Sequence, residues 1–299
     1  MLFRSHWPFC KHKCHYCDFV ALEGHNEYEN QYHEALIQEI KQFAQNRSDK
    51  KPIKTIYLGG GTPSLYPLDL LTELFEVLRN NFDLSQLAEV TLEVNPGGQT
   101  PEHFKTWESL GVTRLSVGVQ ILEEKILKKL NRYQSNQEVE EFFTRAPEYN
   151  FNLSADLIIG LPGVSEDVWN KTIDRVLSWN TEHVSIYFLT VHEQTKLYYG
   201  IKHKKFKLPD EKRLIELYKK TVGKLIESGF TQYELSNFAR NNKISLHNCA
   251  YWERKLYKGF GIGAASFDGE YRFSNEKSLM SYIELMGVGG DSSPQGSFL

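Results

Sequence analysis

Short apolar runs alternate with longer amphipathic stretches along most of this chain. The apolar runs occupy residues 55–58, 90–94, 114–119, 153–159 and 184–189, and a similar segment precedes Cys10. Runs of this length are typical of buried strands. The amphipathic stretches, at residues 28–45, 67–80, 101–110, 123–130, 137–145 and 168–177, have the spacing of helices.

The alternation of strands and helices predicts an α/β fold with a parallel sheet. About six strand–helix units follow one another, which favours a partial (β/α)6 barrel. Right-handed crossovers would place the carboxyl ends of these strands on one face, where loops build ligand sites. A further helix at 210–228 follows a basic loop and Pro209. We therefore expect a barrel core at 1–205, a smaller α+β region at 206–286, and a disordered tail at 287–299 rich in Gly and Ser.

Composition and charge narrow the partners that we expect. The formal net charge is −3 and no long basic block occurs, so neither nucleic acid nor an anionic membrane is an expected partner. The chain has no apolar span of membrane length, and its N-terminus lacks the basic region and apolar stretch of a signal peptide. The expected location is therefore the cytoplasm. Since three of only four cysteines are clustered, disulfide bonds are not expected in that reducing setting.

The clustered cysteines, Cys10, Cys14 and Cys17, form a C-x3-C-x2-C run. Three thiolates this close repel one another and oxidise readily, so a metal is expected to hold them together. Three protein ligands suit a four-iron cluster that keeps one iron open for another ligand. A zinc site completed by His12 or His15 is also compatible with these ligand types.

Glycines and acidic side chains follow or end several predicted strands. The glycines at 59–61 would let backbone groups approach a ligand, although a plain turn explains them more simply. Glu93 could accept hydrogen bonds from ribose hydroxyls, as acidic residues do in dinucleotide sites, or could simply be solvated. Asp156 lies in an apolar strand, where its carboxylate needs a structural hydrogen bond or a ligand.

Together and in this order, the motifs resemble the radical S-adenosylmethionine (SAM) superfamily. Within it they resemble the HemN/HemW family, which comprises oxygen-independent coproporphyrinogen III oxidase and its heme-chaperone relative. The resemblance covers roughly residues 4–286. It is carried by the cysteine run, Gly-Gly-Gly-Thr-Pro at 59–63, Glu-Val-Asn-Pro at 93–96, Leu-Ser-Val-Gly-Val-Gln at 115–120, Asn-Arg at 131–132 and Asp-Leu-Ile-Ile-Gly-Leu-Pro-Gly at 156–163.

The resemblance implies a set of cofactors and the residues that bind them. Cys10, Cys14 and Cys17 would hold a [4Fe–4S] cluster whose open iron binds SAM, and a separate electron donor would reduce the cluster. The implied SAM contacts are Gly60, Gly61, Thr62, Glu93, Gln120, Arg132, Asp156, Tyr16, Thr190 and Ala265. These residue types are compatible with SAM, because carboxylates can bind its ribose hydroxyls and its sulfonium cation, and a guanidinium can bind its carboxylate.

Two features favour the heme-chaperone branch of the family. The oxidase pattern has a further cysteine two residues after the third, where this chain has Phe19. Residues 247–252 read His-Asn-Cys-Ala-Tyr-Trp, which resembles the chaperone signature H-N-x-x-Y-W. We therefore expect a protein that binds heme and delivers it to an acceptor protein. His247 or Cys249 is the candidate heme contact, and the alternative role of His247 is to order its own loop.

Two other functions stay open from the sequence. One is the oxidative decarboxylation of coproporphyrinogen III, in which the chain would be an enzyme, and the other is a zinc-binding structural module. The chain also departs from the family pattern. Arg4 to Cys10 read Arg-Ser-His-Trp-Pro-Phe-Cys in place of Y-I-H-I-P-F-C, so we expect a damaged first strand and one lost SAM contact. Ala265 stands where the chaperones tend to have histidine, and the family continues beyond residue 299, so we expect a shortened copy.

Overall fold

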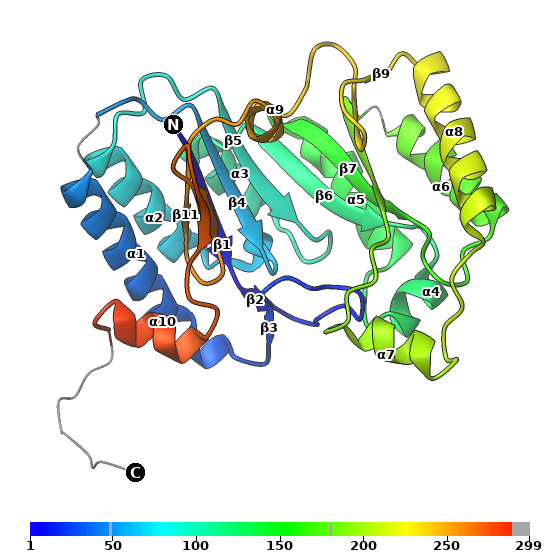
Figure 1. The fold of residues 1–299 in the computed structure, drawn as a ribbon. Coiled ribbons are helices and arrows are strands. Elements are labelled where there is room, and N and C mark those ends of the chain that lie inside the picture. The colour runs from blue at the N-terminus through cyan, green and yellow to red at the C-terminus, as the bar shows by residue number, and fades with distance from the viewer. Residues whose placement is uncertain (48–49, 180, 289–299) are drawn as a thin grey trace, which may run out of the picture.

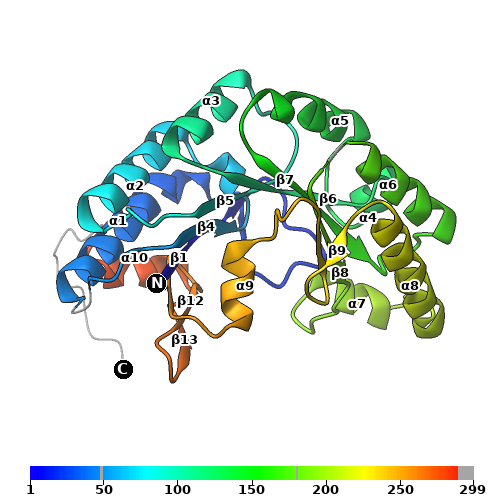
Figure 2. The ribbon, with the colours of Figure 1, turned by 90° about the horizontal axis from the view of Figure 1, so that it is seen from above.

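Six parallel strands form the centre of one large sheet in the computed structural model, which describes residues 1–47, 50–179 and 181–288. These strands are β1 (Leu2–Trp7), β4 (Thr55–Gly60), β5 (Glu89–Val94), β6 (Arg114–Gln120), β7 (Asn152–Ile159) and β8 (His183–Phe188). The full order is β13-β12-β11-β1-β4-β5-β6-β7-β8-β10-β9. Seen from above, the sheet curves into an arc (Figure 2). The predicted α/β fold with a partial barrel is confirmed.

Helices between these strands cover the outer, convex face of the arc (Figure 2). They are α1 (Glu29–Asn46), α2 (Leu68–Asn81), α3 (Pro101–Leu110), α4 (Glu124–Lys129), α5 (Asn136–Arg145) and α6 (Glu166–Ser178), with α7 (Lys196–Lys202) after β8. Short 3-10 helices lie at Asn26–Tyr28, Pro63–Leu65 and Ala146–Glu148. Side chains such as Leu36, Leu74 and Trp169 are fully buried in the main hydrophobic core. Each predicted helix before residue 180 is present, and both of its ends lie within two residues of the expected positions.

The first strand forms fully, contrary to the expectation of damage. All six residues of β1 are in register with β4, and four of them also pair with β11 (Tyr257–Phe260). Phe3 and Trp7 are 1% and 2% exposed, so the unusual sequence still buries large apolar side chains. The expectation was wrong because a central parallel strand is stabilised by neighbours on both sides.

The region after residue 205 extends the same sheet at both ends (Figure 1). Its elements are α8 (Glu211–Glu227), β9 (Thr231–Gln232), β10 (Asn237–Ala239), α9 (Leu246–Trp252), β11, β12 (Ala265–Phe267), β13 (Arg272–Ser274) and α10 (Leu279–Leu285). β10 pairs with β8 at one end, and β11 pairs with β1 at the other. The division into a barrel core at 1–205 and a smaller region at 206–286 stays a proposal. Most of the predicted disordered tail lies outside the described residues.

Two further short strands, β2 (Phe9–Cys10) and β3 (Leu22–Glu23), pair in parallel beside the main sheet and enclose the cysteine segment. None of the helices in the described parts of the chain has the length and apolar character needed to cross a membrane.

Candidate functional site: the cysteine loop and the carboxyl ends of the strands

The loop that carries the three cysteines is held by a pair of short strands at its base and by backbone hydrogen bonds. β2 and β3 close the base, and the Leu22 amide donates a hydrogen bond of 2.8 Å to the Pro8 carbonyl. Within the loop, the Cys17 amide donates to the Cys14 carbonyl over 3.1 Å. Cys10 is buried, whereas Cys14 and Cys17 are half-buried, and all three are free thiols.

Gly61 allows the start of this loop to lie directly against the end of β4. Its amide donates to the Trp7 carbonyl over 2.7 Å. A Cβ atom at Gly61 would lie 2.4 Å from the Pro8 carbonyl oxygen and 2.9 Å from the Cys10 sulfur, closer than real side chains come. The glycine at this position is therefore required by close approach and not by an ordinary turn.

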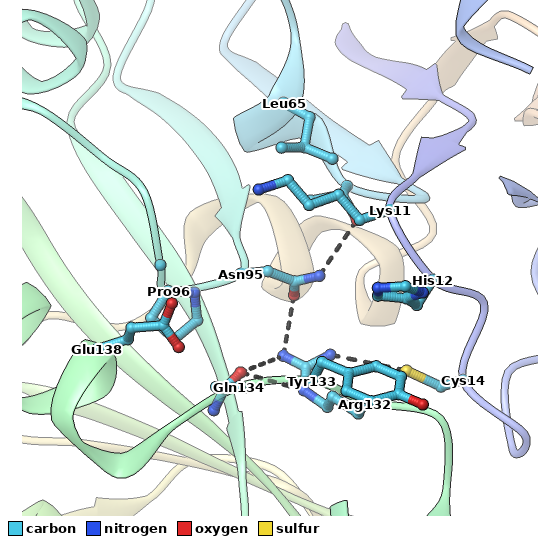
Figure 3. A pocket seen from close by; sticks show the side chains of 12 residues that line it. Lys11, His12, Cys14, Leu65, Asn95, Pro96, Arg132, Tyr133, Gln134 and Glu138 are labelled. Carbon is cyan, nitrogen blue, oxygen red and sulfur yellow. Dashed lines mark hydrogen bonds between the residues drawn. The ribbon is translucent and has the colours of Figure 1, made fainter. Parts of the chain in front are cut away.

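A chain of hydrogen bonds joins Cys10 to Cys14 through Thr62 after β4, Asn95 after β5 and Arg132 after α4. Figure 3 shows the part of this chain from Asn95 to Cys14. The Thr62 hydroxyl donates to the Cys10 sulfur over 3.2 Å, and the Asn95 amide donates to the Thr62 oxygen over 3.2 Å. The Arg132 guanidinium donates to the Asn95 oxygen over 3.0 Å and reaches the Cys14 sulfur at 3.9 Å. The sequence had suggested Thr62 and Arg132. It had not suggested Asn95, although this residue lies in the Glu-Val-Asn-Pro motif.

Arg132 is a buried cation that faces the thiols. It is 8% exposed, and its other donors bind the Gln134 side chain and the Gly118 carbonyl. No carboxylate forms an ion pair with it in the described part of the chain. Burial alone would lower the pKa of Arg132, but the neighbouring Tyr16 and Cys14 outweigh that effect and raise it. A positive charge held here would offset negative charge on thiolates.

The surroundings of Cys10 and Cys17 favour the protonated form of these two thiols. Burial raises the pKa of Cys10, although the Thr62 hydrogen bond partly opposes this. Burial also raises the pKa of Cys17 to about 11, partly opposed by the Phe19 backbone amide. Iron binds the thiolate and would displace these protons, so binding should be coupled to proton release. With a hydroxyl donor and a buried guanidinium already at the sulfurs, the residues fit a thiolate-bound cluster.

A cavity of about 280 Å³ opens beside Cys14 (Figure 3). Its walls include Cys14, Thr62, Asn95 and Arg132 from the hydrogen-bonded chain. The hydroxyl of Tyr16 is buried, and burial together with the neighbouring Cys14 thiol raises its pKa. The structure thus brings together four predicted site residues, Cys14, Tyr16, Thr62 and Arg132, at one edge of the sheet.

Glu93 lies at the end of β5 and is bound to β4. Its carboxylate accepts hydrogen bonds from the Gly60 amide at 3.1 Å and from the Tyr57 hydroxyl at 2.8 Å. Burial raises the pKa of Glu93 to about 6, and the Tyr57 bond and the charge of Arg4 oppose that shift. The carboxylate is therefore oriented by its own neighbours, which is what a positioned ligand contact needs.

Asp156 already has structural hydrogen bonds from neighbouring strands. Ser116 on β6 donates to it over 2.5 Å and Ser154 on β7 over 2.9 Å. Burial raises the pKa of Asp156, and these serine donors partly offset the shift. The Ser154 hydroxyl also lies 2.8 Å from the buried His183 ring. Of the two explanations that the sequence allowed for Asp156, the structural one is seen directly.

The other predicted SAM contacts are more dispersed. Gln120 ends β6 with a φ of 64°, just after an irregularity in the pairing with β7. Thr190 is exposed after β8. Ala265 lies on β12, two strands away from β1 in the sheet order, and packs against the small apolar cluster that contains Tyr257 and Phe267. The structure does not bring Ala265 into the wall of the cavity beside Cys14.

His247 is held on both sides of its ring. Its Nδ1 lies 2.7 Å from the Thr55 hydroxyl and its Nε2 lies 2.8 Å from the Tyr251 hydroxyl. The Glu89 carboxylate accepts the His247 backbone N–H over 2.9 Å, and burial lowers the pKa of the ring to about 3. This geometry supports the ordering role. Cys249 is half-buried on the same helix, and a heme contact by either residue stays a prediction.

Of the two alternative zinc ligands, His12 and His15, His12 is engaged elsewhere. Its Nδ1 lies 3.2 Å from the Glu23 carboxylate, and its ring centre lies 4.6 Å from that of Tyr133. Over residues 1–47, 50–179 and 181–288, no three His, Cys, Asp or Glu side chains come close enough to hold one metal ion.

Comparison with known proteins adds independent information. The family model for the radical SAM superfamily matches residues 5–176, which include the three cysteines. A Bacillus subtilis protein, heme chaperone HemW, is 37% identical over 95% of this chain and 76% of its own length. The Lactococcus lactis heme chaperone HemW is 31% identical over 93% of this chain and 73% of its own. The solved structure of coproporphyrinogen III oxidase HemN from Escherichia coli has a TM-score of 0.83 at 24% identity, covering 96% of this chain and 69% of that one.

Proposed function

Because this chain belongs to the radical SAM superfamily and, within it, to the HemN/HemW family, we propose that it is a heme chaperone, which binds heme and transfers it to acceptor proteins. The likeness to proteins named heme chaperone HemW, over nearly the whole chain, carries this proposal. The absence of a fourth cysteine at Phe19 supports the same branch. The likeness to the oxidase HemN is one of fold, at lower identity.

The superfamily uses a [4Fe–4S] cluster and SAM, which together supply reductive cleavage of a carbon–sulfur bond when bound. We propose Cys10, Cys14 and Cys17 as the cluster ligands. The hydrogen-bonded chain from Thr62 to Arg132 supports this assignment, because it supplies donors and a positive charge at two of the sulfurs. Glu93 stays a proposed SAM contact, supported by its oriented carboxylate.

The function is tested with protein reconstituted anaerobically with iron and sulfide. We expect about four irons and four sulfides per chain, the stoichiometry of one [4Fe–4S] cluster, and loss of the cluster in a Cys14→Ser variant. A colourless product that contains zinc and no sulfide would instead support the structural module.

Heme transfer is measured by loading the protein with hemin and adding apomyoglobin as the acceptor. We expect a saturable hemin spectrum in the chain alone and a shift to the myoglobin spectrum after mixing. In a separate arm the protein receives reductant, SAM and coproporphyrinogen III. Formation of protoporphyrinogen in that arm would assign the chain to the oxidase branch, and absence of any hemin spectrum would reject the chaperone.

A further inference from the structure

A second cavity, of about 460 Å³, lies on the open side of the curved sheet. Figure 2 shows α9 in the space between β13, at one end of the arc, and β8, near the other end. The cavity wall draws on these same elements: Arg4 and Tyr257 come from β1 and β11, Arg272 from β13, Tyr187 from β8, and Trp252 from α9. The function described above leaves this cavity without an assigned role.

The cavity has more positive than negative charge in its wall. Arg4 and Arg272 are its two cations, and Glu234 is its one carboxylate. Glu234 accepts the Ser236 amide over 2.9 Å, in its own turn. Within the described residues neither arginine forms an ion pair with a carboxylate. Two guanidinium groups therefore line the cavity without forming an ion pair among the described residues, and the charge of Arg4 also acts on Glu93.

Arg4 is the more constrained of the two arginines. Its Nε atom is buried and has no hydrogen-bond partner among the described residues. Arg4 and Tyr251 both line the cavity, and the charge of Arg4 acts on Tyr251 and also on Glu93, the proposed SAM contact. A buried donor without a partner costs free energy unless a ligand accepts its hydrogen bond.

Exposed aromatic faces accompany these charges. Trp252 is 69% exposed and Tyr187 is 42% exposed, although both line the cavity. Large aromatic side chains left open beside a cavity are typical of binding sites for flat apolar groups. The wall thus has arginines that can bind acidic substituents and aromatic side chains that can contact a planar ring.

We propose that this cavity binds a planar aromatic dianion, with Arg4 and Arg272 binding its carboxylates and Trp252 and Tyr187 contacting its ring. Since the proposal rests on the function proposed above, the ligand is a porphyrin that carries two propionates. Arginine is suited to this role because its donors match both oxygens of a carboxylate. Binding in this way does not require His247 to leave its partners Thr55 and Tyr251, because iron takes no part in it.

The test compares mesoporphyrin IX, which has no iron and two free propionates, with its dimethyl ester. Binding to the full chain is followed by the porphyrin absorption band and by quenching of tryptophan fluorescence. We expect the diacid to bind at least about tenfold more tightly than the diester, the effect of one charge-assisted hydrogen bond. Arg272→Gln and Arg4→Gln should each weaken diacid binding by about tenfold and leave diester binding unchanged.

Two further variants control for charge and for folding. Arg254 provides a matched control, because its guanidinium lies 5.7 Å from the Phe267 ring and that of Arg272 lies 5.9 Å from it, but only Arg272 lines the cavity. Arg254→Gln should bind the diacid as the parent does. Glu234→Gln removes the one carboxylate of the wall and should tighten diacid binding. Arg272 and Arg254 are both exposed, so neither substitution should prevent folding.

The outcomes separate this site from the function on which it rests. If hemin binds the parent but the arginine variants keep its affinity and its diacid-to-diester ratio, the site is wrong and the chaperone proposal stands. If the diacid binds through the arginines but hemin does not pass to apomyoglobin, the site stands and transfer is rejected. A parent that binds neither porphyrin overturns both proposals.

Discussion

Asn95 links the two predicted site residues that contact the thiols, Thr62 at Cys10 and Arg132 at Cys14. Its amide donates to Thr62 and its oxygen accepts from Arg132, so one side chain connects Cys10 with a buried cation. For Asn95→Ala we expect a loss of about 1 to 3 kcal/mol in the free energy of unfolding, because Arg132 would lose a buried acceptor. Urea denaturation measures this loss. The rate at which a chelator removes iron from reconstituted protein should rise as well.

A matched control for this substitution is Asn81→Ala. The Asn81 amide also donates a hydrogen bond, over 2.8 Å to the Val77 carbonyl, but it does so on the surface of α2. We expect this variant to differ little from the parent in both measurements. If the two variants release iron at the same rate, Asn95 has no special part in the cluster site.

The pH dependence of stability should contain the signature of His6. Its ring is 4% exposed, lies 2.6 Å from the Val20 carbonyl, and burial lowers its pKa from 6.5 to about 4. Between these two values the unfolded chain holds a proton that the folded chain lacks, so stability falls as pH falls from 6.5 to 4. One such proton contributes a slope of up to about 1.4 kcal/mol per pH unit.

His6→Gln removes this proton from both states while keeping an amide donor for Val20. The difference in slope between parent and variant isolates His6 from other buried histidines such as His183, whose pKa burial also lowers. Urea midpoints measured from pH 7 to pH 4.5 give both slopes, and His25→Gln, at an exposed position, is the control. Equal slopes in parent and His6→Gln would contradict the expectation.

At this scale the sequence identified residues by chemical type and could not identify their partners. The cysteine run was visible because three thiols in eight positions are rare, and Arg132 because a family motif contains it. Asn95 also lies in a family motif, Glu-Val-Asn-Pro at 93–96, but it was not singled out, since an asparagine after a strand is common. Its role depends on β4, β5 and the loop before α5 meeting at one edge, which only the folded chain shows.

At the scale of elements, the contact between the cysteine loop and the end of β4 depends on Gly61. Gly61→Ala would place a methyl group 2.4 Å from the Pro8 carbonyl, so the loop has to move away from the strand. We expect this variant to lose stability and to take up less iron on reconstitution. The comparison variant is Gly223→Ala in α8, where an added Cβ would meet nothing within 4 Å.

Gly223→Ala should gain about 0.5 to 1 kcal/mol, because alanine has the higher helix propensity. Thermal denaturation of both variants, with iron determined after reconstitution, gives the contrast. A Gly61→Ala protein with full iron content and parental stability would show that the loop position is not fixed by this close approach.

Elements were predictable in proportion to their length and burial. The six central strands were visible in the sequence as apolar runs, and the helices between them as stretches with amphipathic periodicity. The strands β9, β10, β12 and β13 have only two or three residues each, which is too short for a period to develop. Helix α9 was also missed, because its seven residues are stabilised at their start by Glu89, a residue of β5 far earlier in the chain.

On the scale of the whole molecule, the sheet is completed when β11 returns to lie beside β1. Residues 2–5 pair with residues 257–260, a closure that local sequence patterns cannot reveal. Glu39 on α1 stabilises this return. Its carboxylate accepts hydrogen bonds from the Lys258 ammonium at 2.6 Å, the Gly261 amide at 2.8 Å and the Tyr282 hydroxyl at 2.8 Å, and also from Asn275.

The Glu39–Lys258 pair is largely buried, with side chains 10% and 13% exposed. Removing one partner of such a pair leaves an uncompensated charge, which costs about 3 to 5 kcal/mol. We therefore expect Glu39→Ala to lower the unfolding free energy by about this amount, while Glu34→Ala, on the exposed face of the same helix, should change it little. Hydrogen exchange should localise the loss to β11 and α10 before the central strands. If exchange in Glu39→Ala rises equally in β5 and β6, the closing strands and the central sheet unfold as one unit, and Glu39 stabilises the molecule as a whole.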